Sequence, residues 1–187
     1  MSVTSADFGR LMPAKITLAD VAAMAEADEH HRYELTREGV LVVMTPPSPA
    51  HQRIVMRLIG WLLRHGYSEE QVFTDVGIFT GGGRQPDLTV WATTDLPVAI
   101  EATYADTANL LLAVEIVSPS SKIEDKVHKR EEYARAGIPR YWLVEQDQPQ
   151  TVLMLTLNDR TGEYESLLPA PQPLRWLLTT DPHDYLT

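Results

Sequence analysis

The sequence predicts an α/β fold in which a mixed central β-sheet is flanked by helices and extended by a β-hairpin. Residues 111–117 are an aliphatic run with a single acid, as expected for a strand buried on both faces. A helical pattern and a second apolar strand follow at residues 121–136 and 141–144. The other main elements are a second long helix and a terminal hairpin, at residues 50–65, 151–157 and 164–168.

Length and composition limit the classes of protein to which the chain can belong. With 187 residues, 44% of them hydrophobic, it suits one domain over residues 16–187, preceded by a flexible leader over residues 1–15. The lack of cysteine excludes disulfides and thiolate metal sites and favours a reducing, cytoplasmic compartment. No apolar run approaches the ~20 residues that span a bilayer, so no membrane partner is expected. The net charge of -10 confines any contact with nucleic acid to a local patch.

The N-terminal elements carry one candidate acid. Thr17 can cap a short helix that ends before His30, and residues 33–35 and 40–44 flank a turn as the strands of a hairpin do. Glu34 lies within the first of these strands. Two interpretations stay open: Glu34 is an accessory acid near a metal, or it is the charge of an edge strand.

The predicted helix at residues 50–65 has His51 in its first turn. Apolar residues recur along it at the spacing of a core helix: Ile54, Val55, Leu58, Ile59, Leu62 and Leu63. His51 either aims its imidazole at a cleft or hydrogen-bonds the preceding proline-rich loop, and both interpretations stay open.

A glycine-rich segment at residues 81–83 follows short candidate strands at residues 71–74 and 76–79. It lacks the Lys-Ser/Thr ending of a phosphate-binding loop, and no helical pattern comes after it. The segment is therefore predicted to be a mobile loop near the mouth of a cleft.

Two isolated acids occupy successive strong strands. Glu115 interrupts the aliphatic run, and a buried carboxylate is costly unless it is protonated, paired or bound to a metal. Asp87 follows Pro86 at the start of the preceding strand, and residues 93–109 between the strands are predicted to be a linker or a weak helix. Because carboxylates on neighbouring strands can share a hard divalent cation, Asp87 and Glu115 are the candidate metal ligands.

The predicted helix at residues 121–136 brings a basic group to the same region. Ser121 and Glu124 fit a capping box at its start, and Gly137 and Pro139 end it. Helical spacing then gives a packing stripe, a polar row beside it and a lysine between the two: Ile123, Val127 and Ala134; Asp125, Lys129 and Tyr133; and Lys126. Two acids and a nearby lysine are the parts of a metal-dependent phosphodiesterase site, in which the metal activates water and the lysine orients it or neutralises charge.

These motifs resemble those of the bacterial "putative restriction endonuclease" domain family, a branch of the PD-(D/E)XK nuclease superfamily. The resemblance covers most of the chain and rests on Tyr33-Glu34-Leu35, Gly39-Val40-Leu41, the proline-rich passage up to His51, Pro86-Asp87, Val114-Glu115-Ile116-Val117-Ser118-Pro119-Ser120, Asp125, Lys129, Tyr133, Ala136-Gly137 and Tyr141-Trp142-Leu143-Val144. It implies a restriction-endonuclease-like fold and a homodimer.

One position departs from the superfamily pattern. Two residues after Glu115, where the superfamily has a lysine, this chain has Val117. In the family that the chain resembles, the basic residue stands on the following helix. The register of the polar row favours Lys129, with Lys126 as the alternative.

The sequence therefore predicts a Mg²⁺- or Mn²⁺-dependent nuclease acting on DNA, with Asp87 and Glu115 as metal ligands and Lys129 as an electrostatic helper. Glu34 would orient a second ion or a water molecule. Supporting or substrate contacts are expected from His51, Asp125 and Tyr133. The alternative is a catalytically silent nuclease-like module that binds a partner or nucleic acid, which the acidic net charge favours. A small-molecule hydrolase is disfavoured, because the chain has no serine or cysteine nucleophile elbow.

Overall fold

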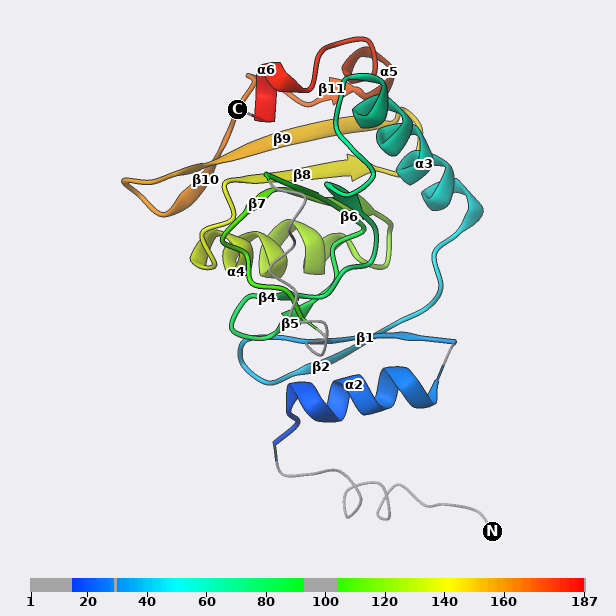
Figure 1. Ribbon diagram of the computed structural model, residues 1–187, viewed down its shortest axis with the longest axis vertical. Coiled ribbons are helices and arrows are strands. Elements are labelled where there is room, and N and C mark those ends of the chain that lie inside the picture. The colour runs from blue at the N-terminus through cyan, green and yellow to red at the C-terminus, as the bar shows by residue number, and fades with distance from the viewer. Residues whose placement is uncertain (1–14, 29, 93–103, 187) are drawn as a thin grey trace.

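The computed structural model describes residues 15–28, 30–92 and 104–186 (Figure 1). The leader predicted over residues 1–15 lies almost entirely outside these ranges, as does most of the linker predicted at residues 93–109. None of the helices in these ranges is long and apolar enough to cross a membrane.

The larger of two sheets is the predicted mixed central sheet. It contains β3 (Val72–Phe73), β6 (Leu88–Trp91), β7 (Leu110–Val117), β8 (Arg140–Glu145), β9 (Thr151–Asn158), β10 (Glu163–Ser166) and β11 (Gln172–Pro173). Its order is β10-β9-β8-β7-β6-β3, and β11 also pairs with β9. Only β7 and β8 are parallel among these pairs of described strands. The hairpin of β9 and β10 extends the sheet at one edge, as predicted.

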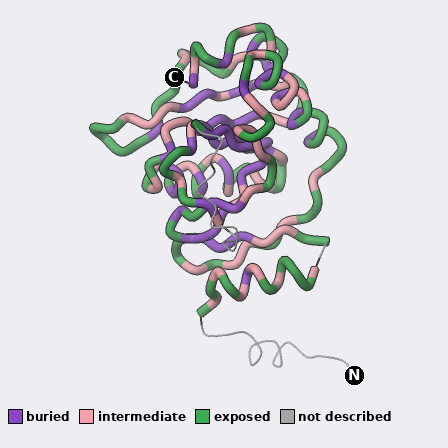
Figure 2. Tube along the Cα trace, viewed as in Figure 1, coloured by how far each residue is buried: buried purple, intermediate pink, exposed green. Residues whose placement is uncertain are grey.

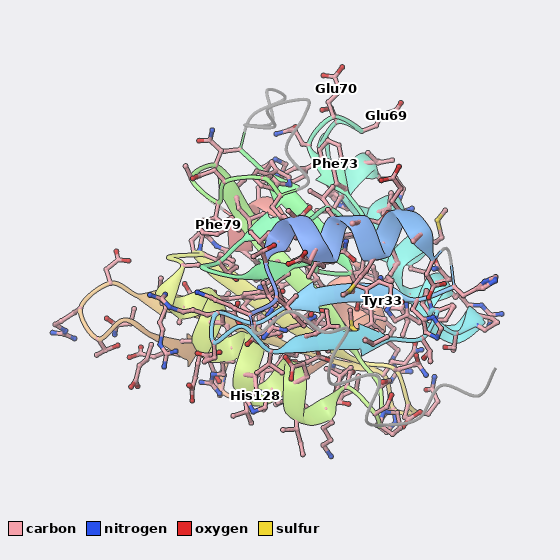
Figure 3. All side chains as sticks on the ribbon, turned by 90° about the horizontal axis from the view of Figure 1, so that it is seen from below. Tyr33, Glu69, Glu70, Phe73, Phe79 and His128 are labelled. Carbon is pink, nitrogen blue, oxygen red and sulfur yellow. The ribbon has the colours of Figure 1, made fainter. Side chains whose placement is uncertain are left out.

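The smaller sheet packs against α2 (Leu18–Ala27). It contains β1 (Arg32–Leu35), β2 (Leu41–Met44), β4 (Ile78–Phe79) and β5 (Gly83–Arg84), in the order β2-β1-β5-β4. Strands β1 and β2 form the predicted hairpin. The helix α2 begins with a capping box of Thr17 and Asp20 and packs against β1. Figure 3 views the molecule from the side of α2 and the smaller sheet. Glu69 and Glu70 project from the loop that follows the helix of residues 49–64.

Side chains along β7 alternate between two cores, one on each face of the central sheet. Leu112, Val114 and Ile116 join the core beneath α3 (Pro49–Arg64), to which α5 (Leu174–Leu177) and α6 (His183–Leu186) also contribute. Ala113 and Val117 join the second core, on the face of η1 (Glu124–His128) and α4 (Lys129–Arg135). Figure 2 shows burial concentrated in these central strands. Since alternate residues share a face, Glu115 faces η1 and α4.

The first half of the predicted helix at residues 121–136 differs from its prediction. A π-helical turn, η1, precedes α4, and the predicted end is confirmed by Gly137, whose φ is 75°. The predicted capping box is wrong, because the Ser121 hydroxyl accepts from the backbone N–H of Ser118 and Glu124 pairs with Arg84.

The predicted packing stripe of this helix is wrong at Ile123 and Val127, whereas its third member, Ala134, packs against the second core. Ile123 and Val127 are 69% and 47% exposed, whereas Asp125, Lys129 and Tyr133 are buried. The polar row faces the protein interior because its charged members are paired there, and such pairing offsets the cost of their burial.

Two smaller predictions are corrected as well. The glycine segment at residues 81–83 packs closely against the backbone at the end of β1 and is not the predicted mobile loop. A Cβ on Gly82 would lie 2.2 Å from the carbonyl oxygen of Leu35, and Gly83 belongs to β5. In α3, Leu63 is exposed, and Trp61, whose indole N–H donates to the carbonyl of Thr180, is buried.

Candidate active site

Asp87 and Glu115 lie opposite each other at adjacent strands. Leu88 pairs with Val114, and one further step along this antiparallel ladder brings Asp87 opposite Glu115. Residues directly opposite have their Cβ atoms about 4.5–5.5 Å apart on one face of a sheet. The backbone N–H of Ile116 donates to Asp87 Oδ2 at 2.7 Å, which fixes this carboxylate beside β7.

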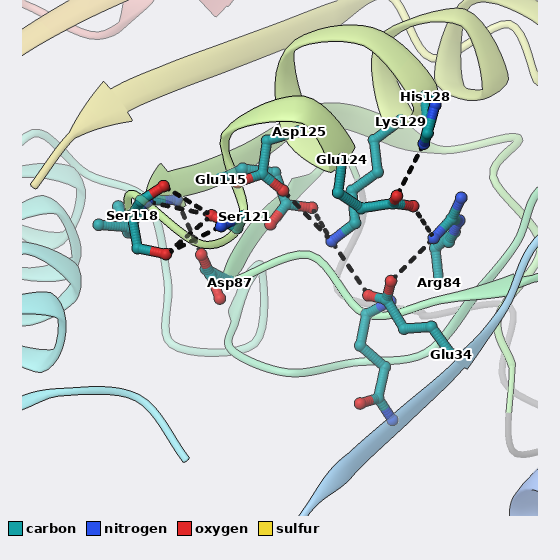
Figure 4. A network of polar contacts seen from close by, with 12 residues as sticks. Glu34, Arg84, Asp87, Glu115, Ser118, Ser121, Glu124, Asp125, His128 and Lys129 are labelled. Carbon is teal, nitrogen blue, oxygen red and sulfur yellow. Dashed lines mark hydrogen bonds and ion pairs between the residues drawn. The ribbon is translucent and has the colours of Figure 1, made fainter. Parts of the chain in front are cut away.

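Lys129 reaches Glu115 from the first turn of α4. Its Nζ lies 3.0 Å from Glu115 Oε1, 3.1 Å from Glu34 Oε1 and 3.8 Å from Asp125 Oδ1 (Figure 4). The hydroxyl of Tyr133 donates to the same Glu115 oxygen at 2.8 Å. Because Lys129 is 1% exposed, these carboxylates rather than water compensate its charge.

The structure therefore brings Lys129 and Tyr133 of the polar row into contact with Glu115, whereas Lys126 does not contact Glu115. The ammonium of Lys126 pairs with Glu145 at the end of β8, and 33% of the Lys126 side chain is exposed. Glu34 is not the solvated charge of an edge strand: β1 is an inner strand of its sheet, and Glu34 is fully buried.

Two side chains hold Asp87 from the other side of the site. His51 Nε2 lies 2.9 Å from Asp87 Oδ2, and Arg32 Nη2 lies 3.0 Å from Oδ1. His51 takes this position from the first turn of α3, where Ser48 caps the helix by accepting from the backbone N–H of His51. Sequence reasoning missed Arg32, and its only local signal is that it lies two residues before Glu34, on the same face of a strand.

Arg84, which sequence reasoning also missed, joins three elements from inside the protein. Its guanidinium lies 3.0 Å from Glu34 Oε2 and 2.7 Å from Glu124 Oε1 (Figure 4). It also lies 2.7 Å from Glu132 Oε2. The backbone N–H of Gln85 donates to Glu34 Oε1, the oxygen that Lys129 also contacts. Arg84 thereby fixes the orientation of Glu34, and its only local signal is its position three residues before Asp87.

A cavity of about 520 Å³ lies over these groups. Its charged lining combines the sheet and helix residues with the two partners of Asp87: Arg32, His51, Asp87, Glu115, Glu124, Asp125 and Lys129. Its other walls include Ser118, Ser120 and Ser121, the end of β2 and the proline-rich segment at residues 45–48. A single cleft therefore contains acids, bases and hydroxyl groups at the meeting point of the two sheets.

Comparison with known proteins supplies the family. Residues 18–181 match the model of the Uma2 family, described as "Putative restriction endonuclease". The chain belongs to this family. No curated protein matches it.

The Uma2 chain also shares its fold with a solved structure. It superposes on a crystal structure of a "putative nuclease" from Anabaena variabilis ATCC 29413 with a TM-score of 0.60. The match covers 99% of this chain and 98% of the other at 18% identity, so it bears on the fold alone. The family and the restriction-endonuclease-like fold predicted from the sequence are thus confirmed.

Burial sets the ionisation of the three central groups of this Uma2 site. For Glu115, burial raises the pKa well above its ordinary value, and the charges of Asp87, Asp125 and Glu34 act in the same direction against Lys129. For Lys129, burial alone would lower the pKa, but the charges of the surrounding carboxylates have a larger, opposite effect. The pKa of Lys129 is therefore raised, and its ammonium stays charged. The site therefore holds a cation, Lys129, beside an acid whose ionised form a bound divalent cation would favour further.

Asp87 has the opposite balance. Burial raises its pKa, but the hydrogen bond and charge of His51, with the charge of Lys129, lower it to about 2. Asp125 lacks so close a cation, and burial raises its pKa to about 6 although Lys129 opposes the shift. The pKa of Asp87 thus lies far below neutral pH, and its carboxylate is ionised there.

The two candidate ligands fit a hydrated Mg²⁺ or Mn²⁺ ion better than a protein-only cage. Within the described ranges no group of three or more His, Cys, Asp or Glu side chains is arranged to hold a metal. Mg²⁺ commonly keeps several waters and uses only one or two carboxylates. Both polar contacts that Glu115 makes with described residues go to Oε1, which leaves Oε2 for a cation. Asp87 has three contacts for about four lone-pair sites.

Proposed function

We propose that the protein is a metal-dependent nuclease that hydrolyses phosphodiester bonds in DNA, with Mg²⁺ or Mn²⁺ as its cofactor. The observation that carries the proposal is the pair of Asp87 and Glu115, opposite each other in one cleft, with Lys129 Nζ 3.0 Å from Glu115. The family match supports a nuclease in general. DNA as the substrate and the choice of metal belong to the proposal.

Each residue has a defined task in this mechanism. Asp87 and Glu115 would hold the cation, which would supply a coordinated water of lowered pKa and a positive charge beside the phosphate. Lys129 stays protonated at Nζ and stabilises the negative charge that develops on the phosphate as the P–O bond to the leaving group breaks. Tyr133 fixes Glu115 Oε1 by its hydrogen bond, and the buried Glu34 keeps Lys129 directed at the cleft.

Cleavage of plasmid and single-stranded DNA in Mn²⁺ tests the proposal. We expect Glu115→Gln to lower the cleavage rate by roughly 10²-fold or more, because it removes a charge from the metal-binding pair while keeping the shape of the side chain. Glu131→Gln is the matched control, since Glu131 is an exposed acid on α4. Equal rates in the wild type and Glu115→Gln would refute the assignment.

The second candidate is a catalytically silent module that keeps the fold for binding. It is favoured by the contacts of Asp87, whose oxygens are engaged by Arg32, His51 and the backbone of Ile116. Calorimetric titration with Mn²⁺ separates the two functions. Binding that is lost in Asp87→Asn and Glu115→Gln supports the nuclease, and no binding in the wild type supports the silent module.

A further inference from the structure

Arg32 has more hydrogen-bonding capacity at the cleft than its described partners use. Its Nη2 donates to Asp87 and its Nη1 to Asp75, while Nε is buried without a hydrogen-bond partner among the described residues. The side chain lines the cleft and is 21% exposed. His51 Nδ1, on the same cleft, also lacks a described partner. A buried guanidinium N–H without a partner is uncommon, and its position at the cleft points to a ligand that accepts hydrogen bonds.

Asp75 holds the guanidinium from the side away from Asp87. It is the only non-glycine residue with a positive φ, 55°, in the described ranges. This left-handed conformation is less favourable for residues with a side chain than for glycine, but Asp is among the few that adopt it as single residues. In this conformation the loop after β3 aims the Asp75 carboxylate at Arg32.

The position of Arg32 beside the metal-binding pair changes its role once a cation is present. Burial lowers the pKa of Arg32, but the charges of Asp87, Asp75 and Glu115 raise it, so the guanidinium lies in the field of both candidate ligands. A divalent cation on Asp87 and Glu115 would compete with Arg32 for Asp87. The planar donor fork of arginine would then be available to an anion, and its geometry matches phosphate.

We propose that Arg32 binds a backbone phosphate of DNA beside the metal-binding pair, and that Asp75 is the residue that positions its guanidinium there. This inference rests on the proposed nuclease function, because it assigns the phosphate contact within the same site. It adds a substrate-binding residue from β1, in the smaller sheet, to the acids at β6 and β7.

Binding of DNA in the presence of Ca²⁺, a divalent cation that also takes carboxylate oxygens as ligands, tests this role with the metal-binding pair occupied and without Mg²⁺ or Mn²⁺ to support cleavage. The affinity of a fluorescein-labelled DNA duplex is measured by anisotropy at a series of salt concentrations. Each phosphate contact contributes about 0.9 to the slope of log K against log salt concentration for duplex DNA. We expect Arg32→Gln to weaken binding about tenfold and to reduce the slope by about one. Arg32→Lys should keep the slope, because it keeps the charge.

Two further variants complete the test. Arg64→Gln, an exposed residue at the far end of α3 from His51, should leave affinity and slope unchanged. Asp75→Asn should weaken DNA binding by a smaller factor and leave Mn²⁺ binding unchanged. The inference is overturned if Arg32→Gln keeps the wild-type slope while its melting curve shows a folded protein, or if the wild type shows no salt-dependent binding. Cleavage by the wild type in Mn²⁺, measured separately, reports on the nuclease function itself.

Discussion

At the scale of single residues, the position of the basic group follows from the two faces of β7. Val117 shares a face with Glu115 and is buried in the second core, together with Tyr133 and Tyr141. A lysine at position 117 would place its charge in that apolar core, which is costly without a partner. Lys129 brings the charge to Glu115 from the helix instead, at 3.0 Å.

Replacement of Lys129 should affect both activity and stability. Lys129→Met leaves three buried carboxylates without their shared cation, and breaking buried ion pairs in this way costs roughly 3–5 kcal/mol. The free energy of unfolding, measured with urea, should fall accordingly, and Mn²⁺-dependent cleavage should be lost. Lys126→Met breaks only a part-exposed pair, so it should cost less than about 1 kcal/mol and retain cleavage. Full cleavage by Lys129→Met would refute its role.

Asp125 should give a pH dependence of stability. Its pKa is raised by burial to about 6 in the folded protein, against about 4 in the unfolded chain. Between these values the folded state binds the additional proton, so wild-type stability is favoured at low pH and declines as pH rises from about 4 to about 6. Two pKa units correspond to at most about 3 kcal/mol.

Asp125→Asn removes this titration and tests its sign. Urea unfolding curves of the variant and the wild type should diverge in favour of the variant as pH rises through this window, and the difference should then level off. Asp159→Asn, at an exposed position of the turn between β9 and β10, should follow the wild type at every pH. A constant difference between Asp125→Asn and the wild type across the window would show that Asp125 does not titrate in this way.

At the scale of elements, the strand–helix–strand unit was predictable and the inner face of its helix was not. The aliphatic run, Gly137 and Pro139 define β7 and the end of α4 by local chemistry. The packing stripe was assigned on the rule that a helix buries its apolar side. That rule fails here because the interior faces a site, where Lys129 and Glu132 find opposite charges.

Arg84 could not be predicted, because its partners are far away in the sequence. Glu34, Glu124 and Glu132 lie 50, 40 and 48 positions from it, on β1 and on the helix. No periodicity links such positions, so only the folded arrangement reveals the cluster. Glu115, by contrast, could be proposed from the sequence because it is an isolated acid in an apolar strand, where a charge needs a partner, and Asp87 because it is a second isolated acid on the neighbouring strand.

The contact between β5 and β1 gives an element-scale prediction. In Gly82→Ala the new Cβ would lie 2.2 Å from the carbonyl oxygen of Leu35, so the backbone must shift, and we expect a loss of roughly 1–3 kcal/mol. Cleavage should also fall, since β1 carries Glu34 and β5 carries Arg84. Urea unfolding and the DNA cleavage rate measure the two effects.

Gly60→Ala is the matched control for this prediction. Gly60 lies inside α3, and the nearest atom to a new Cβ is the flexible end of Arg64 at 3.2 Å. Alanine should therefore stabilise the helix by about 0.5–1 kcal/mol and leave cleavage unchanged. A Gly82→Ala protein as stable as Gly60→Ala would show that the close approach at β5 is not required.

At the scale of the whole molecule, the site depends on how the two sheets meet. The smaller sheet supplies Arg32, Glu34 and Arg84, and the larger supplies Glu115 on β7, with Asp87 immediately before β6. Most of these groups are charged and buried, which costs stability unless opposite charges lie close by. An ion that binds only the folded arrangement should therefore stabilise the whole fold.

Thermal unfolding in Mn²⁺ measures this coupling. An ion that binds the native state alone adds about 2.7 kcal/mol of stability at a hundred times its dissociation constant. For a chain of this length, each kcal/mol raises the melting temperature by roughly 2–4 °C, so an increase of about 5–10 °C is expected for the wild type. Glu131→Gln should show the same increase, because that exposed acid lies outside the cleft. Asp87→Asn and Glu115→Gln should lose most of it, since each leaves one ionised ligand for the cation. An equal increase in all four proteins would place the Mn²⁺ ion elsewhere on the surface and would separate the acid pair from metal binding.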